Sequence, residues 1–325
     1  MERCTARVLL CVLCCFVLAA APQTAKGQGT VNSQSGHGRE FWREIAKNHY
    51  AIPAGQEAYP LAKELSGYLG LPHPELRDDV AYSMLAVWIT RQKKFSPEEL
   101  VTLLEEWQAN LRRRIGETGT DSIFKRSFSA LCLSALAERD LKEPFLGEAR
   151  YRTLLDAVLT YLGDERDLRG FDAKKGWIHA TAHTADLLAA LAQNRFFTKQ
   201  DQERVLKAIM QRLETANEIF NYGEQDRLAN AAAVIASRED FDIQAWNSWV
   251  ALMDKEDRVV WNDSPPKMLA LARFQNDSYF LRATAAHFPQ ACYKHVRRSA
   301  EICPGRTSPS LSGLASPGER HGVTN

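Results

Sequence analysis

The chain has 325 residues, of which 45% are hydrophobic and 25% are charged, so it is long enough to bury a sizeable core. Its 41 lysines and arginines stand against 40 aspartates and glutamates, which gives a formal net charge of +1. This balance excludes a whole-chain field that would steer nucleic acid or an anionic membrane towards the protein. Only 13 prolines and 18 glycines, with blocks rich in alanine and leucine, favour helices over a β architecture with many turns.

The first 25 residues have the layout of a secretory signal peptide. Arg3 and Arg7 form a short positive region, and residues 8–21 are an uninterrupted apolar run that ends in small residues. The run is too short to span a membrane comfortably. We therefore expect residues 1–25 to direct export to a bacterial periplasm or to the outside of the cell. An uncleaved membrane anchor and a lipoprotein modified at Cys14 or Cys15 are the alternatives.

Three more parts are expected after the leader. Residues 26–37, rich in glycine, glutamine and serine, are predicted to be a flexible linker, and residues 38–290 a single all-α domain. Residues 291–325 contain few large apolar side chains and are predicted to be a disordered tail. Beyond the leader the chain keeps only Cys132, Cys292 and Cys303, an odd number that does not form a disulfide framework. Cys132 lies in an apolar helical stretch and is expected to be a buried free thiol, whereas the spacing leaves open whether Cys292 and Cys303 pair.

Four segments of the predicted domain share one pattern, rich in alanine and other small residues and apolar at helical spacing. Their starts lie 48, 55 and 45 residues apart, and they cover residues 79–91, 127–139, 182–194 and 227–239. A charged amphipathic helix is expected after each, over residues 97–114, 147–162, 198–221 and 242–253. This alternation predicts an all-α fold, a HEAT-like α-solenoid or α/α superhelix of stacked helical hairpins. A globular bundle is the alternative.

One stretch, residues 176–186, gathers an aromatic and several titratable side chains and is predicted to open a helix. His179 and His183 lie four residues apart, so on a helix they share a face and can chelate one Zn²⁺ or Fe²⁺. Asp186 is about 10 Å along the axis from His179, too far to join the same ion on a straight helix. It is expected instead to accept a hydrogen bond from His183 or to pair with an arginine of a neighbouring helix. A third metal ligand would come from another repeat, with Asp121 and Asp78 the best placed.

The same polar side chains also allow a structural interpretation. Most lie near the starts of the repeated helices, where stacking would align arginines, aspartates and histidines in a ladder that satisfies itself. The expected members are Arg77, Asp78, Arg126, His179, His183, Asp186, Arg227 and Asn230. If the ladder lines a concave groove, its candidate binding residues are Trp177, His179, His183, Asp186, Arg126, Asp121 and Arg227.

Several of these residues have a second, local explanation. Trp177 is expected either to stack on a ligand or to pack as a hydrophobic staple at the start of its helix. Asp121 is a candidate helix cap, and Asp167 and Asp172 are candidate turn residues around Gly170. The sequon at Asn276 is of a kind that is common by chance.

Four motifs that occur in order carry a resemblance to a known family. They are residues 76–82, 119–131, 166–172 and 176–186. Together they resemble the bacterial family catalogued as domain of unknown function 2785 (DUF), over about residues 60–255. The resemblance implies a helical domain of that extent. It supplies no activity, because the family is itself uncharacterised.

The sequence predicts an exported helical-repeat protein that binds a protein or small-molecule partner in the groove, without nucleic acid and without a membrane span once the signal peptide is removed. A hydrolase is the alternative, with His179 or His183 as metal ligand or general base. Whether the chain is an enzyme stays open, as does a divalent metal cofactor. Ser127 and its neighbours Thr120 and Ser129 give no case for a nucleophile, because the sequence assigns neither histidine a contact with a serine.

Overall fold

A computed structural model describes residues 36–257, 260 and 264–287. The chain divides into two units, Met1–Gly36 and His37–Asn325, and every element described below belongs to the second. The predicted signal peptide and tail, Cys292 and Cys303, and all of the predicted linker except its last two residues lie outside the described residues. Within the described part, no helix combines the length and the apolar character needed to cross a bilayer.

The second unit begins with two short helices, α1 (Arg39–Lys47) and α2 (Ala58–Tyr68). A π-helix, η2 (Glu75–Tyr82), then continues directly into α3 (Ser83–Thr90). From there, helices rich in small residues alternate with amphipathic ones. The small-residue helices are α5 (Ser122–Lys142), α7 (Ala180–Ala192) and α9 (Glu224–Ala236). The amphipathic helices are α4 (Pro97–Asn110), α6 (Glu148–Asp164), α8 (Lys199–Thr215) and α10 (Ile243–Asp257), and α11 (Met268–His287) is the last element described.

Local sequence explains where the amphipathic helices begin. Ser96 caps α4 through a capping box, in which its hydroxyl accepts from the backbone N–H of Glu99 and its own N–H donates to the Glu99 carboxylate. Thr198 and Asp201 form the same reciprocal pair at the start of α8. A helix cap of this kind stabilises a helix by about 1 kcal/mol.

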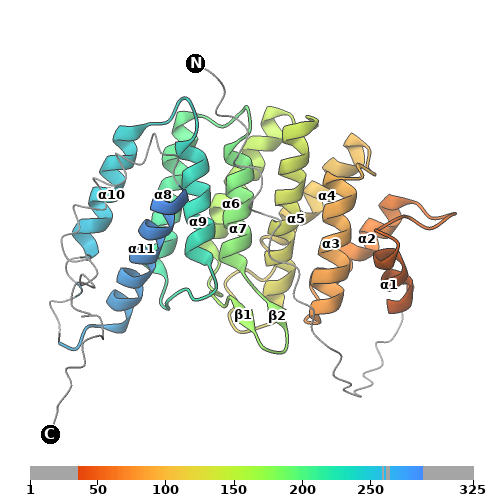
Figure 1. Ribbon diagram of the computed structural model, residues 1–325, viewed down its shortest axis with the longest axis horizontal. Coiled ribbons are helices and arrows are strands. Elements are labelled where there is room, and N and C mark those ends of the chain that lie inside the picture. The colour runs from red at the N-terminus through yellow and green to blue at the C-terminus, as the bar shows by residue number, and fades with distance from the viewer. Residues whose placement is uncertain (1–35, 258–259, 261–263, 288–325) are drawn as a thin grey trace, which may run out of the picture. The chain divides into compact units, whose positions relative to one another are not determined.

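The small-residue helices pack against one another in a row, α5 on α7 and α7 on α9, and α3 and α11 extend the row at its two ends. The amphipathic helices pack on this row. Figure 1 shows the row from α3 through α5, α7 and α9 to α11, with α10 beyond α11. Alanines such as Ala182 and Ala185, both fully buried in α7, permit this close approach. The prediction of an all-α chain is confirmed, and each of the four repeated segments is helical, although the first begins inside the π-helix.

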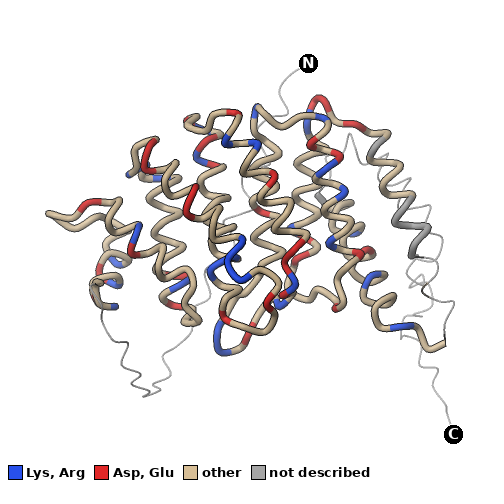
Figure 2. The backbone as a smooth tube through the Cα atoms, turned by 180° about the vertical axis from the view of Figure 1, so that it is seen from behind, with Lys and Arg blue, Asp and Glu red and all other residues tan. Residues whose placement is uncertain are grey.

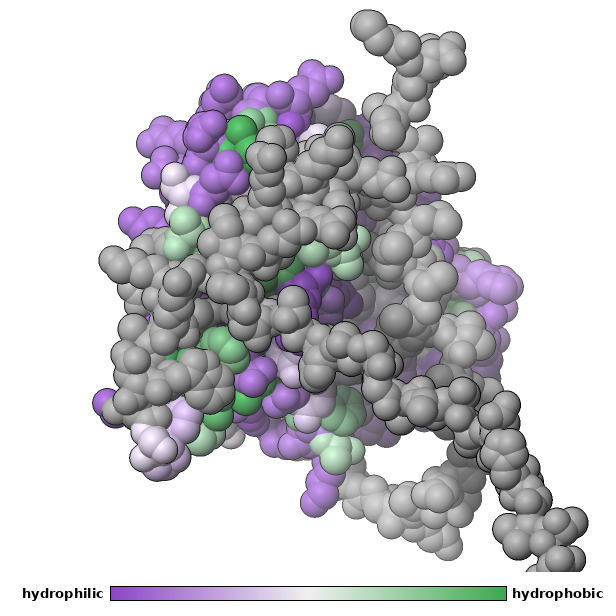
Figure 3. All heavy atoms as spheres, turned by 60° about the vertical axis from the view of Figure 1, so that its left-hand side comes forward, coloured by the Kyte–Doolittle hydropathy of each residue, from purple (hydrophilic) through white to green (hydrophobic). Residues whose placement is uncertain are grey.

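The core is built from large apolar side chains on these helices. Trp42, Trp88, Trp107 and Trp246 are completely buried, and so is the free thiol of Cys132, as predicted. Charges of both signs are spread along the described unit (Figure 2). At the end formed by α10 and α11, hydrophobic side chains reach the surface in small patches among polar ones (Figure 3).

One local prediction is wrong. Residues 176–179 are not the first turn of a helix, because Gly176–Trp177 is strand β2, which pairs antiparallel with β1 (Phe171–Asp172). The helix α7 begins at Ala180. Gly176 and His179 both have positive φ angles, +73° and +48°, which break the right-handed helical path on either side of Trp177. His179 is therefore the residue before the helix and not a member of its first turn.

Candidate functional site

The β1–β2 hairpin is closed by its own turn. The Oδ1 atom of Asp172 accepts hydrogen bonds from the backbone N–H groups of Lys174 and Lys175, at 2.8 and 2.9 Å. These donors hold the pKa of Asp172 below its usual range. The prediction of a turn residue here is confirmed. The turn places Phe171 directly opposite Trp177 in the register of the hairpin.

Arg77 fixes the hairpin to the π-helix. Its side chain is completely buried, and its Nη2 donates to the backbone carbonyls of Lys175 (2.7 Å) and Trp177 (3.1 Å). The guanidinium carbon lies 4.1 Å from the ring centroid of Phe124 and 4.7 Å from that of Phe128, both on α5. A planar cation thus satisfies the open carbonyls of the hairpin while it packs on two aromatic rings. The backbone beneath Trp177 is consequently well supported.

A third segment, the loop before α9, meets the hairpin at Gly170. A Cβ atom on Gly170 would lie 2.3 Å from Oε1 of Glu224 and 2.5 Å from the ring of Tyr222, so only glycine permits this approach. The backbone N–H of Tyr222 donates to Oε2 of Glu224 at 2.9 Å, which sets the course of the loop. Tyr222 is thereby held beside the hairpin.

These contacts create a cluster of three exposed aromatic side chains, Phe171, Trp177 and Tyr222, which we call the aromatic ridge. Their exposed fractions are 40%, 38% and 46%. The ring centroid of Phe171 lies 4.9 Å from that of Trp177 and 5.9 Å from that of Tyr222, and Trp177 and Tyr222 are 6.4 Å apart. The ring planes cross at 41° to 82°, so the ridge is bulky and not flat. Large apolar rings gathered at a surface are the usual material of a binding site.

His179 lies directly behind the ridge. Its ring stacks on Trp177, with centroids 4.4 Å apart and an interplanar angle of 26°. Its Nε2 is 3.0 Å from the backbone carbonyl oxygen of Tyr222. Burial lowers the pKa of His179 to about 4, so the ring is neutral at pH 7 and its Nε2–H donates to that carbonyl. The histidine thereby links the hairpin to the loop of Tyr222.

His183 lies one layer deeper and is held by a serine. Its Nδ1 is 2.8 Å from the hydroxyl oxygen of Ser127, and that hydroxyl donates to the backbone carbonyl of Ile178. Because the hydroxyl proton is engaged, the imidazole Nδ1–H must donate to Ser127. Burial holds the pKa of His183 well below its usual range. The structure thus supplies the histidine–serine contact that the sequence did not assign, but Ser127 is buried and has no free proton to lose.

The described residues do not bring a third ligand to the two histidines. Nowhere in this part of the chain do three histidine, cysteine, aspartate or glutamate side chains gather as a metal site would need. The imidazole centroids are 5.7 Å apart in an edge-on arrangement, not side by side on one helical face. Asp121 pairs with Lys175 at 2.6 Å, and Asp78 pairs with Arg77 at 2.7 Å. Both candidate third ligands are thus engaged elsewhere.

Three other residues of the predicted site, Asp186, Arg126 and Asp121, have partners or positions of their own. Asp186 pairs with Arg227 of α9, one of the two arrangements expected for it. Arg126 is completely buried and binds Glu165 through Nε and Nη2, at 2.6 and 3.1 Å. Asp121 stands at the cap position of α5, but its side chain makes no capping hydrogen bond. Phe171 and Tyr222 were missed, because a single aromatic in a two-residue strand or in a loop has no spacing pattern that would reveal its neighbours.

Residues 111–285, more than half of the chain, match the family described as "Protein of unknown function (DUF2785)". The chain belongs to this family. The DUF2785 region contains the aromatic ridge and both histidines, and it begins and ends later than the four motifs indicated, so residues 76–82 with Arg77 precede it. No curated protein and no solved structure gives a match.

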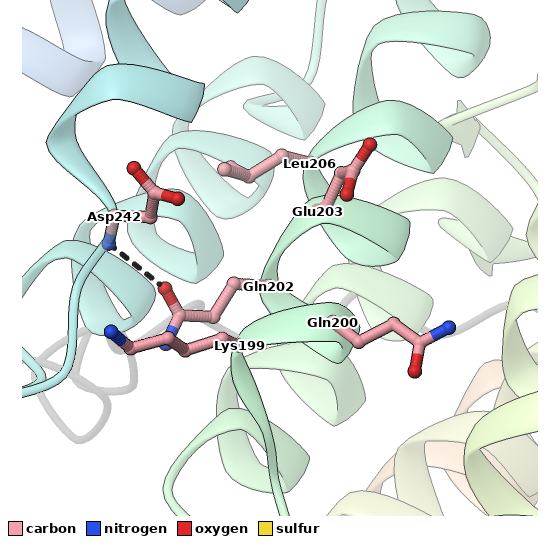
Figure 4. Close-up of a pocket in the computed structure, with 6 residues that line it drawn as sticks. All are labelled: Lys199, Gln200, Gln202, Glu203, Leu206 and Asp242. Atoms are coloured by element: carbon pink, nitrogen blue, oxygen red, sulfur yellow. Dashed lines mark hydrogen bonds between the residues drawn. The ribbon is translucent and has the colours of Figure 1, made fainter.

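A small cavity of about 170 Å³ also lies within the DUF2785 region, between the first half of α8 and Asp242, the residue before α10. The side chain of Gln202 points towards Asp242 and accepts from its backbone N–H at 3.3 Å (Figure 4). The Nε2 of Gln202 donates to Asp240 as well, so its polar atoms are used within the protein. The cavity is lined by Lys199, Gln200, Gln202, Glu203, Leu206 and Asp242.

Proposed function

We propose that the protein is a binding protein that holds a partner against the aromatic ridge. The observation that carries this proposal is that Phe171, Trp177 and Tyr222, from separate segments, expose their rings at one place while glycine and a buried arginine support them from behind. Side chains of this kind supply most of the binding energy at interfaces, since they bury a large area with little loss of conformational freedom.

The proposal includes the architecture and the location expected from the sequence. Successive packing of α3, α5, α7, α9 and α11 supports a HEAT-like α-solenoid within a single domain, residues 38–290. Such solenoids commonly bind partners along their faces and ends. The composition of residues 1–25 supports export to the periplasm or the cell exterior.

The geometry favours binding over hydrolysis. A general base works best when its pKa lies near the working pH, whereas burial lowers the pKa of His179 to about 4. His183 is buried and donates to Ser127, which leaves that serine without a base. The polar ladder predicted for a concave groove is, in our proposal, the support beneath the ridge.

Ligand-induced shifts in the melting temperature of the full chain test this function, with the tryptophan emission of the wild type as a second measurement. The full chain would be titrated with three probe sets: nonapeptides of mixed composition, neutral and acidic oligosaccharides, and vesicles with and without phosphatidylglycerol. At least one set should shift the emission and raise the melting temperature of the wild-type protein. Trp177→Ala and Tyr222→Ala should lose the binding while they keep the circular dichroism spectrum. Failure of every probe, or binding that survives both substitutions, overturns the proposal.

A further inference from the structure

We propose that the partner held on the ridge is an acidic segment of a protein, with apolar side chains on the rings and carboxylates on a group of cations beside them. This inference rests on the proposed function and names its ligand class. It comes from the charges on two loops, residues 111–121 and residues 165–177, of which the second contains the hairpin. These loops lie together, since the guanidinium of Arg169 donates to the backbone carbonyl of Thr120 at 2.9 Å.

The two loops hold an excess of cations, seven against five carboxylates. Three of the cations form ion pairs within the loops: Arg114 with Glu117, Arg169 with Asp167, and Lys175 with Asp121. The other four make no ion pair with any residue that the structure describes, and their side chains are exposed. They are Arg112, Arg113, Arg166 and Lys174. We call these four the unpaired cations.

The carboxylates of the same loops are all engaged. Glu165 is buried against Arg126, and Asp172 accepts from the backbone of its own turn. The remaining three are bound in the ion pairs with Arg114, Arg169 and Lys175. An approaching anion therefore meets cations whose charge is not compensated and carboxylates that already have partners. Charge complementarity of this kind attracts acidic groups and fixes their orientation.

One further feature sets the direction of an acidic partner. Two exposed carboxylates, Glu218 and Asp226, lie four residues before and four residues after Tyr222 in the sequence. The acidic part of the partner would consequently lie over the hairpin and the 111–121 loop, with its apolar part across the ridge.

The form of the ridge favours a protein over the other anions that cations attract. A sugar ring stacks best on an open flat face, but one face of Trp177 is covered by His179 and the three rings are steeply inclined. A membrane needs side chains that protrude, whereas these rings are more than half buried. Aromatic and arginine side chains are both enriched at protein–protein hot spots.

The test uses the full chain and fluorescein-labelled nonapeptides with three central aromatic or leucine residues. Three versions carry glutamate, glutamine or lysine at the flanking positions. We expect the glutamate version to bind at least 10-fold tighter than the glutamine version, and more weakly as salt is raised. The double variant Arg112→Gln/Arg113→Gln should weaken the glutamate peptide about 10-fold and leave the glutamine peptide unchanged. The backbone carbonyl of Arg113 that holds Arg126 is retained in this variant. Arg150→Gln, on the amphipathic helix α6, is the matched control and should have no effect.

The outcomes separate this inference from the proposed function. Equal binding of the glutamate and glutamine peptides, lost in Trp177→Ala but not in the double arginine variant, keeps the ridge as a binding site and overturns the acidic partner. Binding of acidic oligosaccharides or of phosphatidylglycerol vesicles in place of the peptides, with the same sensitivity to Arg112 and Arg113, also overturns it. Absence of binding to every probe overturns the proposed function itself.

Discussion

Trp177 and His179 stack face to face at 4.4 Å, two residues apart across the junction between a strand and a helix. The left-handed backbone of His179 makes this contact possible, because it turns the chain so that both rings lie on the same side. Trp177 presents one face to the histidine, and 38% of the residue is exposed at the surface. The protonation state of the His179 imidazole therefore affects how firmly Trp177, and with it the ridge, is held.

Stability should fall as the pH is lowered from about 6.5 towards 4, partly because of His179. The unfolded chain takes up a proton on this residue near pH 6.5, whereas the folded chain does so only near its lowered pKa of about 4. The folded state binds fewer protons in this window, so each such histidine reduces the unfolding free energy by up to about 1.4 kcal/mol per pH unit. The pKa of His183 is lowered in the same direction.

Urea denaturation between pH 6 and pH 4.5 measures this dependence. His179→Gln should show a shallower slope than the wild type, because its amide still reaches the Tyr222 carbonyl without titrating. Other groups also contribute to the pH dependence of stability, such as Asp78, whose pKa burial raises to about 6. These contributions are the same in the wild type and in His179→Gln, so they cancel when the two slopes are compared. The exposed His49, changed to Asn, serves as control and should leave the slope as it is. Identical slopes for the wild type and His179→Gln would contradict the assignment.

The sequence predicted the helices well and the site incompletely, for physical reasons. Helices such as α5 and α7 follow from local periodicity, which each segment carries by itself. The hairpin was missed because its two strands have two residues each, too short for any alternation to be visible. It is held by Arg77, about a hundred residues earlier in the chain. A sequence pattern within one segment cannot reveal a contact between residues so far apart in the chain.

Composition pointed to the region of the candidate site but not to all of its residues. His179, His183 and Trp177 do meet, as the polar stretch suggested, whereas the helical spacing that would have allowed the two histidines to chelate one metal ion is lost because His179 precedes the helix. The pair between Asp186 and Arg227 was foreseeable from the repeats, because equivalent positions on stacked helices face each other. Tyr222 was not, since its place depends on the absence of a side chain at Gly170.

Replacement of Arg77 should destabilise the protein strongly and free the hairpin. Arg77→Met leaves the carbonyls of Lys175 and Trp177 without their donor and Asp78 without its cation, so we expect a loss of about 3–5 kcal/mol in unfolding free energy. Arg77→Lys should recover only part of it, because an ammonium lacks the planar fork.

Denaturation curves and limited trypsin digestion measure both effects. Cleavage after Lys174 and Lys175 should accelerate in Arg77→Met under native conditions, since the turn would no longer be tied down. Arg43→Met removes an exposed arginine that pairs with Glu75 of the same π-helix, and should change the unfolding free energy far less than Arg77→Met does. A loss in Arg77→Met no larger than that in Arg43→Met would show that the anchor contributes little.

Ser127 should matter for stability and not for covalent chemistry. Ser127→Ala strands the Nδ1–H of His183 and the carbonyl of Ile178, both inside the protein, and is expected to cost about 1–3 kcal/mol. The exposed Thr160→Ala on α6, which loses a hydroxyl bonded to its own helix, should stay within about 0.5 kcal/mol. Incubation of the wild type with a fluorophosphonate should give no adduct at Ser127. An adduct there would reinstate the hydrolase.

Asn276 ties the loop of Tyr222 to α11, the last helix described, and it should do so without carrying a glycan. Its side chain on α11 is completely buried, with Oδ1 accepting from the backbone N–H of Phe220 (2.9 Å) and Nδ2 donating to the carbonyl of Glu218 (3.0 Å). The Nε2 of Gln225 also donates to Oδ1, at 3.2 Å. Both ends of the amide are therefore engaged, and an oligosaccharide has no access to Nδ2 in the folded protein.

Asn276→Asp tests this anchor with almost no change in shape. The substitution replaces the donor to Glu218 by an oxygen and buries a carboxylate against a carbonyl, so we expect a loss of at least about 1–3 kcal/mol in unfolding free energy. Amide hydrogen exchange in the 216–223 loop should rise with it, because Phe220 and its neighbours lose their fixed partner, and peptide affinity at Tyr222 should fall in parallel. Asn221→Asp, on the exposed part of the same loop, is the matched control and should alter neither stability nor exchange. If the sequon is glycosylated on secretion from a eukaryotic host, or if the two aspartate variants are equally stable, Asn276 does not hold the loop in the way described.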